Sequence, residues 1–509
     1  MRKHFIGIVL ILWVGAIFGM AQPTQLQLTS QVNNGAALQD SSAEMPGKYN
    51  LASKPGELLR HPPAIENVSD KPNTVEVSLV AEPDRLSLLP GKLTDVYAYN
   101  GMVPGPTLEV TEGDKVTIRF KNNLPEETTV HWHGIKLPFA ADGSPLHAVA
   151  PGEEYVYEYT ILPGSAGTYW YHPHPHHRTA WQVGMGLYGA MIVHPKEDPL
   201  PNSISSKLIL LSDNRFTEEG ELDFPDPGTR QARMDEMNGR EGDVLFVNDQ
   251  IMPTIDIRKG ETQRWRIINA SGARIYRLAL EGHTFWHIGS DGGLFEKPVE
   301  KQEIILSNGE RAEILVQGTG QKDAEYVFQT LPYDRYMPHT RPKDWSETKD
   351  VLRVSYSKEK TTKLAQIPKT LRFVPPIDTV EATGTQTMLL SQGLINSKKM
   401  DLDRVDVTVP YGATEIWEVE NLVGMDHPFH LHGFQFQLIS RNGQPVTFRR
   451  WEDTINLPKR EKARFIVHYD TYPGKWMYHC HILDHEDDGM MGILEVLQPN
   501  QQSTKMETQ

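Results

Sequence analysis

The chain has 509 residues, 66 of them acidic and 51 basic, which gives a formal net charge of −15. This charge argues against a nucleic-acid partner, because binding to phosphates needs a basic surface that releases counterions. At roughly 150 residues per domain, the length predicts about three domains. The single cysteine, Cys480, excludes an intramolecular disulfide. Non-covalent packing must therefore stabilise the fold.

The first 21 residues have the pattern of a secretory signal peptide. Arg2 and Lys3 form a basic head, an apolar run follows from residue 5, and small residues precede the expected cleavage point after Ala21. An uncleaved anchor is the alternative, although about 20 apolar residues are usually needed to cross a bilayer. We expect export to the periplasm or the medium, with no stable membrane insertion after cleavage.

Residues 22–72 are rich in Gln, Asn, Ser and Pro without periodicity, which predicts a flexible lead-in. From Asn73 onward, short runs of β-branched and aromatic residues alternate with turn residues. This alternation is typical of antiparallel β-sandwiches. Long helical stripes are absent from the sequence.

An internal repeat supports three domains. In residues 106–122 and again in 253–269, a proline precedes a glycine by seven residues and an asparagine follows that glycine by nine, and a weaker copy spans 405–421. A strand, a glycine turn and a second strand explain the spacing. We predict an all-β fold of three consecutive sandwich domains at 73–200, 201–365 and 366–509.

Ten of the twenty histidines lie in four short clusters. The clusters are His131-Trp132-His133, His172-Pro173-His174, His427-Pro428-Phe429-His430-Leu431-His432, and His479-Cys480-His481 with His485. Imidazole combined with thiolate and thioether ligands favours copper, whereas sites for hard cations are rich in carboxylates. A single His-x-His is weak evidence, but four such pairs with one central cysteine indicate a metal centre.

Strand geometry divides these residues into two groups. Residues two apart on a strand point to the same face, so each His-x-His presents two imidazoles to one side. By the same rule Cys480 points away from its two neighbours, and His427 points away from His430 and His432. We therefore predict two kinds of metal site, back to back.

The first predicted site holds Cys480, His427, His485 and, as a weak axial ligand, Met490. Two histidines, a thiolate and a methionine make a blue-copper electron-transfer site. The second site gathers the eight paired histidines, which are more than one copper ion needs. Because Cys480 lies between His479 and His481 in the chain, a short covalent path joins the two sites.

These motifs resemble those of the multicopper oxidases, the group with three cupredoxin domains that includes laccases and bacterial periplasmic copper oxidases. The resemblance covers about residues 75–498 and includes His-Trp-His-Gly at 131, Thr-Tyr-Trp-Tyr-His-Pro-His at 168, His-Pro-Phe-His-Leu-His-Gly at 427 and the run from His479 to Met490. It implies cupredoxin-like Greek-key sandwiches and four copper ions per chain.

The resemblance also assigns the ligands. His131 and His430 would bind the type 2 copper, and His427, Cys480, His485 and Met490 would bind the type 1 copper. The type 3 pair would be held by His133, His172, His174, His432, His479 and His481. Residue parity alone does not separate type 2 from type 3 ligands.

Two acids match positions that relay protons in bacterial relatives. Asp142 lies nine residues after His133, and Glu486 follows His485. Reduction of dioxygen to water consumes protons, so an acid path is required. For Glu486 the alternative is a solvated acidic loop, because Asp484, Asp487 and Asp488 surround it.

Four other histidines are expected to bind no metal. His283 and His287 of the middle domain are four residues apart, out of the two-residue register, and no cysteine accompanies them. His176 and His177 are expected to be polar loop residues. The middle domain is therefore predicted to hold no copper.

The predicted function is a monomeric oxidase that couples four one-electron oxidations of a small reducing substrate to the reduction of O2 to water. Phenols and aromatic amines are the expected substrates, as in laccases. A cuprous or other metal-ion oxidase in copper tolerance is the alternative, suggested by Met490-Met491 and the export signal, although residues 340–400 contain only Met388 and Met400. A third hypothesis is a copper-binding envelope scaffold without turnover.

Overall fold

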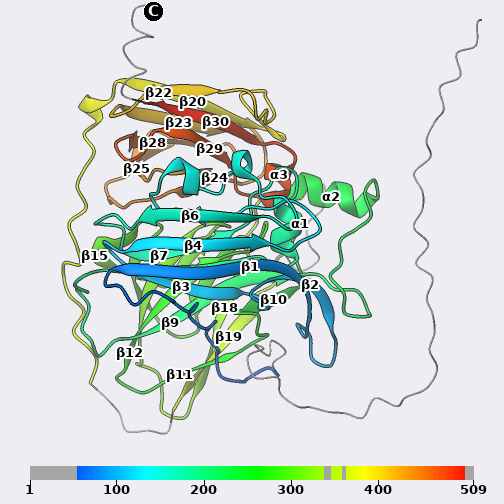
Figure 1. Ribbon diagram of the computed structural model, residues 1–509. Helices are drawn as coiled ribbons and strands as arrows, with labels where there is room; N and C mark the ends of the chain where they lie inside the picture. The colour runs from blue at the N-terminus through cyan, green and yellow to red at the C-terminus, as the bar shows by residue number, and fades with distance from the viewer. Residues whose placement is uncertain (1–53, 338–344, 358–362, 499–509) are drawn as a thin grey trace, which may run out of the picture. The chain divides into compact units, whose positions relative to one another are not determined.

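The computed structural model describes residues 54–337, 345–357 and 363–498, so the predicted signal peptide and residues 22–53 of the predicted lead-in lie outside it. The described residues form six β-sheets with a few short helices (Figure 1). Within them, no helix has both the length and the apolar character needed to cross a bilayer. The predicted all-β class is confirmed.

The first pair of sheets packs around a core that includes Val77, Ile118, Trp132 and Tyr171. One sheet has the order β2-β1-β4-β6 and the other β3-β8-β7-β5. The strands are β1 (Thr74–Leu86), β2 (Thr94–Tyr99), β3 (Gly105–Thr111), β4 (Lys115–Asn122), β5 (His131–His133), β6 (Glu154–Thr160), β7 (Gly167–His172) and β8 (Gly189–His194).

The second pair encloses Trp265, Ile314 and Phe328. Its sheets have the orders β10-β9-β12-β17-β14-β15 and β11-β19-β18-β13-β16. The strands are β9 (Ser205–Asn214), β10 (Val244–Val247), β11 (Thr254–Ile257), β12 (Thr262–Asn269), β13 (Tyr276–Leu280), β14 (Phe285–Ser290), β15 (Gly293–Lys301), β16 (Glu303–Leu306), β17 (Arg311–Gln317), β18 (Glu325–Thr330) and β19 (Lys349–Tyr356).

The third pair encloses Trp417, Phe429 and Phe465, together with Cys480 and Met490. Its sheets have the orders β21-β20-β23-β28-β25-β26 and β22-β30-β29-β24-β27. The strands are β20 (Gly384–Ser391), β21 (Leu394–Ile395), β22 (Val407–Pro410), β23 (Thr414–Asn421), β24 (His427–Leu431), β25 (Phe436–Arg441), β26 (Gln444–Pro445), β27 (Thr454–Leu457), β28 (Lys462–His468), β29 (Gly474–Cys480) and β30 (Met491–Leu497).

The sheets are mixed, which corrects the prediction of purely antiparallel sandwiches. Each pair of sheets contains two parallel neighbours: β1–β4 and β3–β8, β9–β12 and β11–β19, and β20–β23 and β22–β30. Parallel neighbours arise where the chain crosses from one sheet of a sandwich to the other. The predicted boundaries near residues 200 and 365 fall between the pairs, in the intervals 195–204 and 357–383.

The sequence repeat marks the place where the chain crosses from one sheet to the other. In each copy the strand before the glycine belongs to one sheet and the strand after it to the other, as β3 and β4, β11 and β12, and β22 and β23. The buried asparagine that ends each copy, Asn122, Asn269 or Asn421, accepts a hydrogen bond from the amide two residues later. Asn122 and Asn269 each donate to two main-chain carbonyls, and Asn421 donates to three. Asn421 binds the carbonyl of Met425 in this way and so fixes the loop before His427.

The part of the predicted flexible lead-in that the structure describes is paired with two domains. The amides of Gly56 and Leu59 donate to the carbonyls of Met252 and Thr254, and the amide of Ile65 donates to Thr107. These residues thus run along β11 and β3. Composition missed this pairing because main-chain hydrogen bonds to a strand edge need no particular side chain.

Three short helices gather beside one end of the sandwiches: α1 (Thr179–Gly184), α2 (Arg230–Asn238) and α3 (Leu483–Asp487). Figure 1 shows them together at the right of the view, and α3 contacts both of the others. Each comes from a different pair of sheets. The residues on and around α3 are therefore enclosed by all three parts of the fold.

Candidate metal centre

Strands of the first and third sheet pairs bring the histidine clusters together. β5 pairs with β7, and β24 pairs with β29. Rings from the two parts then interleave: His131 stacks on His432 with centroids 3.9 Å apart, and His133 stacks on His430 at 3.8 Å. The meeting of these strands creates one buried cluster.

All eight paired histidines are buried in this cluster. Their ring nitrogens form overlapping groups within 4.8 Å, namely His131–His133–His172, His131–His430–His432 and His174–His432–His479. The eighth, His481, places its Nε2 3.3 Å from Nδ1 of His133. Below we refer to these eight residues as the histidine cluster.

Unpaired ring nitrogens show that the histidine cluster fits a metal ion. His131, His172 and His430 each bind a main-chain carbonyl through Nδ1, at 2.8, 2.9 and 2.9 Å, and the Nε2 of each is buried without a hydrogen-bond partner among the described residues. A ring that donates from Nδ1 carries a lone pair on Nε2. Several lone pairs in one buried space suit a Lewis acid.

Burial favours the neutral form of seven of the eight imidazoles. It is the largest cause lowering the pKa of His479 to about 3. Burial and then the charges of neighbouring rings hold the pKa of six others, His133, His172, His174, His430, His432 and His481, well below the usual range. Neutral rings at physiological pH are ready to bind a metal ion without losing a proton.

A second group lies within the core of the third sheet pair. His427, Cys480 and His485 have ligand atoms within 4.8 Å of one another, and Cys480 Sγ is 3.6 Å from His485 Nδ1. Met490 is fully buried beside them, with its amide donating to the His485 carbonyl and its carbonyl accepting from the Cys480 amide. Burial raises the pKa of Cys480 to about 12, so a thiolate here needs a bound cation.

The two groups adjoin through three consecutive residues. His479 and His481 belong to the histidine cluster, whereas Cys480 between them faces the second group. The structure therefore places Cys480 and His427 apart from the eight paired histidines, as strand parity predicts, and brings His485 and Met490 beside them.

Asp142 lies against the histidine cluster. Its carboxylate Oδ2 accepts a hydrogen bond from His432 Nδ1 at 2.9 Å, and its main-chain oxygen accepts one from His131 Nδ1 at 2.8 Å. The residue is buried in the turn after the short 3-10 helix of residues 139–141. Asp142 thus orients two rings of the cluster.

Glu486 is buried rather than part of a solvated loop. It belongs to α3, with Oε1 3.4 Å from His174 Nε2 and Oε2 3.2 Å from His479 Nδ1. Burial, and secondly the charge of Asp487, raise the pKa of Glu486 well above its usual range. The carboxyl group beside His174 and His479 thus has a raised affinity for a proton.

The four histidines predicted to bind no metal lie outside both groups. His283 contacts the Tyr356 hydroxyl and the Glu281 carbonyl, both at 2.7 Å. His176 and His177 stack on each other, with centroids 3.6 Å apart. None of them, nor His287, joins a group able to hold a metal ion in the described ranges.

A cavity of about 430 Å³ opens beside the second group. His427 and His485 line it, and His485 Nε2 also contacts the carbonyl of Met237 on α2 at 3.2 Å. Its other lining residues are Leu422, Val423, Met425, Met237, Glu236, Asp488, Arg460, Gln392, Gly393 and Gly424. Of these, Asp488 lies within the sequence motif from His479 to Met490.

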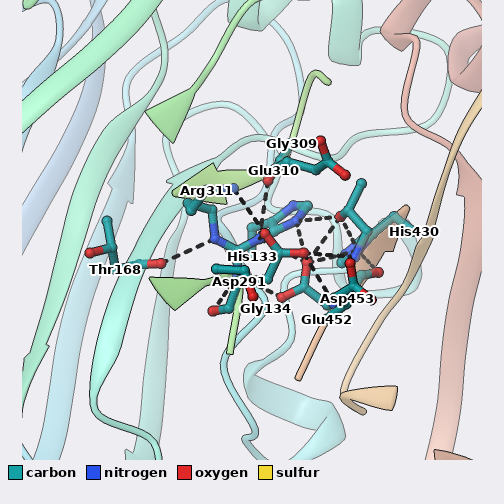
Figure 2. Close-up of polar contacts among 12 residues, drawn as sticks. His133, Gly134, Thr168, Asp291, Gly309, Glu310, Arg311, His430, Glu452 and Asp453 are labelled. Atoms are coloured by element: carbon teal, nitrogen blue, oxygen red, sulfur yellow. Dashed lines mark hydrogen bonds and ion pairs between the residues drawn. The ribbon is translucent and has the colours of Figure 1, made fainter. Parts of the chain in front are cut away.

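Two further residues at the histidine cluster escaped the sequence analysis. Figure 2 shows Arg311 of β17 and Asp453, which precedes β27, within a polar network that includes His133 and His430. Asp453 Oδ1 is 3.1 Å from His133 Nε2, and Arg311 forms an ion pair with Asp453. No local pattern marks either residue, because each acts across a domain boundary.

Comparison with known proteins agrees with the geometry. Family models described as multicopper oxidase match residues 81–198, 226–358 and 373–500. The cell division protein FtsP of Xenorhabdus nematophila is 30% identical over 86% of this chain and 91% of its own length.

Two solved structures are similar over most of their length. A multicopper oxidase from Campylobacter jejuni, described as a metallo-oxidase, is 37% identical with a TM-score of 0.79, covering 89% of this chain and 98% of that one. A laccase from Pediococcus acidilactici is 31% identical with a TM-score of 0.76, covering 88% and 96%. The chain belongs to the multicopper oxidase family.

Proposed function

We propose that this multicopper oxidase holds four copper ions and couples one-electron oxidations of a small substrate to the four-electron reduction of O2 to water. One observation carries the proposal: two buried ligand groups adjoin through His479, Cys480 and His481. A substrate-side centre and an oxygen-side centre need such a connection.

The ligand assignment follows the two groups. His427, Cys480, His485 and Met490 would hold the type 1 ion. His131 and His430 would hold the type 2 ion, and His133, His172, His174, His432, His479 and His481 the type 3 pair. Bound copper would supply reversible one-electron redox chemistry and a place for dioxygen to react.

The chain's own residues prepare both centres. Main-chain carbonyls hold the rings of His131, His172 and His430 in one tautomer, which leaves Nε2 of each for a metal ion. Burial of the whole histidine cluster excludes bulk water. Reactive oxygen species are thereby kept from solvent.

Asp142 and Glu486 are proposed to handle the protons that dioxygen reduction consumes. Asp142 lies on the His131–His432 side of the histidine cluster, and Glu486 lies on the His174–His479 side. Each carboxyl group is in hydrogen-bond range of a cluster ring. General acids in this position typically contribute a factor of about 10²–10⁴ to the rate.

Phenols and aromatic amines are the proposed substrates. The cavity beside His427 and His485 has apolar walls from Leu422, Val423 and Met425, and about 430 Å³ suits a single aromatic ring with substituents. A similar protein is named a laccase.

Oxidation of a metal ion such as Cu(I) is the second candidate function. Thioethers of Met237 and Met425 and carboxylates of Glu236 and Asp488 line the same cavity, and thioethers suit Cu(I). The similar Campylobacter jejuni protein is described as a metallo-oxidase.

A scaffold without turnover is the third candidate, and a relative bears the name of a cell division protein. Retention of all twelve ligand positions in two buried groups supports an oxidase instead.

We further propose that the chain acts as a monomer after export. Mass spectrometry of secreted protein starting at Gln22 would support export, and an intact N-terminus in the cytoplasm would oppose it.

The test is oxygen uptake by the copper-loaded chain with a phenol and with Cu(I), for the wild type and for Met237→Leu. Leucine keeps the apolar volume and removes the thioether. We expect uptake with both donors and unchanged kcat/KM for the phenol in the variant. A Cu(I) efficiency above that for the phenol, and lowered tenfold or more by Met237→Leu, would favour the metal-ion oxidase. No uptake with any donor would favour the scaffold.

A further inference from the structure

None of the middle domain's histidines that the structure describes joins either ligand group, yet the domain reaches the histidine cluster through β17 and the turn before it. Arg311 is the first residue of β17 and is buried, with 1% of its surface exposed. In Figure 2 its guanidinium group lies between Thr168 of the first domain, to the left, and Asp453 and His430 of the third, to the right. Groups from all three domains therefore meet at this arginine.

Every N–H donor of this guanidinium group has a partner. Nε donates to the Thr168 carbonyl at 3.1 Å. Nη1 donates to the Gly309 carbonyl at 3.0 Å and to Asp453 Oδ1 at 2.8 Å, and Nη2 to the Asp291 carbonyl at 3.0 Å and to Asp453 Oδ2 at 2.6 Å. The planar fork thus grips both oxygens of Asp453, which a lysine cannot reproduce.

Asp453 in turn contacts two histidines of the cluster. Its carboxylate, which pairs with Arg311, lies 3.1 Å from His133 Nε2, and Thr454 Oγ1 lies 3.2 Å from the same nitrogen. A carboxylate accepts hydrogen bonds, so His133 is placed to donate from Nε2 and to present Nδ1 to the cluster. The Nδ1 atom of His133 is indeed the one that faces His481 Nε2, at 3.3 Å. The main-chain oxygen of Asp453 accepts from His430 Nδ1 at 2.9 Å, so His430 presents Nε2.

Two glycines lie where the domains approach each other closely around the cluster. Gly134, directly after His133, has a φ of 86°, and a Cβ there would collide with Arg311 Nη2 and Asp453 Oδ2. Gly309, in the turn before β17, has a φ of 87°, and a Cβ there would lie 2.8 Å from the His481 ring. Backbone from the first and middle domains therefore approaches the cluster as closely as glycine allows.

We infer that Arg311 is a positioning residue: by binding Asp453 it fixes His133 as an Nδ1 ligand, so that the middle domain acts on a copper cluster to which none of its described histidines belongs. The inference rests on the proposed function in taking copper as the occupant of the histidine cluster. The tautomer of His133 is independent of that assumption.

Arg311→Lys tests the inference, because it keeps the positive charge and removes the planar guanidinium group that binds both oxygens of Asp453. Arg266→Lys is the matched control. Arg266 is likewise a buried arginine of the middle domain that binds an acid, Glu313, and a first-domain residue, Thr168, but it contacts no histidine of the cluster.

The first measurement is copper retention against a chelator, read as the blue absorption of the type 1 ion and, separately, by metal analysis of the copper that remains in the histidine cluster. Loss of a partner behind a metal-binding histidine lowers metal affinity about 10–100-fold. We expect that loss at the histidine cluster of Arg311→Lys, with the blue absorption kept, and neither change in Arg266→Lys. Asp453→Asn should match Arg311→Lys, and the double variant should lose no more than either single one.

The second measurement needs no copper. Nitrogen NMR of ¹⁵N-histidine-labelled apoprotein, with His133 assigned by its absence in His133→Gln, reports which ring nitrogen carries the proton. We expect Nε2–H in the wild type and in Arg266→Lys, and a tautomer mixture in Arg311→Lys.

The outcomes separate the inference from the proposed function. A wild type that binds no copper but shows the expected tautomers would overturn the function and keep the positioning role. Wild-type cluster retention and a fixed Nε2–H in Arg311→Lys would overturn the inference. So would equal loss of both copper signals in Arg311→Lys and Arg266→Lys, since that result marks a general loss of stability.

Discussion

Cys480 is the residue on which the two centres depend, because its thiol faces one group while its chain neighbours belong to the other. Cys480→Ser replaces a soft sulfur ligand with a hydroxyl that binds copper poorly. We expect the blue absorption and the oxidation of organic dyes to disappear, with copper retained in the histidine cluster. The absorption spectrum and metal analysis check this, and an unchanged blue band would refute the assignment.

Glu486→Gln isolates the proton role, because glutamine keeps the size of the side chain. We expect the oxygen-dependent half-reaction to slow by about 10²-fold or more, since the amide cannot release a proton. Anaerobic reduction of the protein by substrate should keep its rate and serves as the internal control. Stopped-flow kinetics measure both steps. Equal slowing of the two would show that Glu486 supports the structure rather than proton transfer.

At the residue scale, the sequence predicted the candidate ligands but not the side chains that hydrogen-bond to them. Parity placed Cys480 opposite His479 and His481 because alternation is a local property of a strand. Glu486 stood among other acids, and its burial depends on packing of α3 against α1 and α2, which come from other domains. Arg311 and Asp453 were missed because their partners are distant in the chain.

At the scale of elements, the turn after β5 is closely packed against the other two domains. Gly134→Ala places a Cβ against the Arg311–Asp453 pair. A Cβ at Gly152, which has a similar φ of 80°, would meet no atom within 4 Å. Both alanines carry the cost of a left-handed backbone, about 1–2 kcal/mol.

We therefore expect Gly152→Ala to lower the free energy of unfolding by only that amount, with full copper loading. Gly134→Ala should lower it further and weaken copper binding in the histidine cluster. Denaturant unfolding and metal analysis compare the two. Equal effects would mean that the contact with Arg311 and Asp453 is loose enough to admit a methyl group.

Elements were the most predictable level of the fold. The spacing of proline, glycine and asparagine marked β3–β4, β11–β12 and β22–β23, because the glycine turn and the buried asparagine corner are both local. Parallel pairing was not visible, since it depends on which sheet the chain enters after each turn. Helix α2 lies beside the cavity, and its Met237 carbonyl contacts His485. The strand-like periodicity that predicted the other elements is absent from α2, so the sequence did not predict this contact.

At the scale of the whole molecule, the two centres should respond differently to pH. Ligand histidines whose pKa is held at about 3 for His479 and about 4 for His427 remain neutral in weak acid, so copper displaces no proton from them. The thiol of Cys480, with its pKa raised to about 12, must lose a proton when copper binds.

The copper affinity of the second group, which contains Cys480, should thus fall about tenfold for each unit by which the pH is lowered, because one proton competes with the metal. The histidine cluster should keep its affinity from pH 7.5 to pH 5.5. Chelator competition at several pH values measures both. A steep loss at the cluster below about pH 6.5, the ordinary pKa of histidine, would show that its rings are accessible to protons.

The first and third domains supply the candidate ligands, and the middle domain binds Asp453 beside them through Arg311. The central claim is that the two ligand groups act together in four-electron reduction of O2. The most direct test is the number of molecules of a one-electron donor oxidised per O2 consumed by the copper-loaded chain. The account predicts four, with no hydrogen peroxide formed. Two per O2 with peroxide accumulating would contradict it.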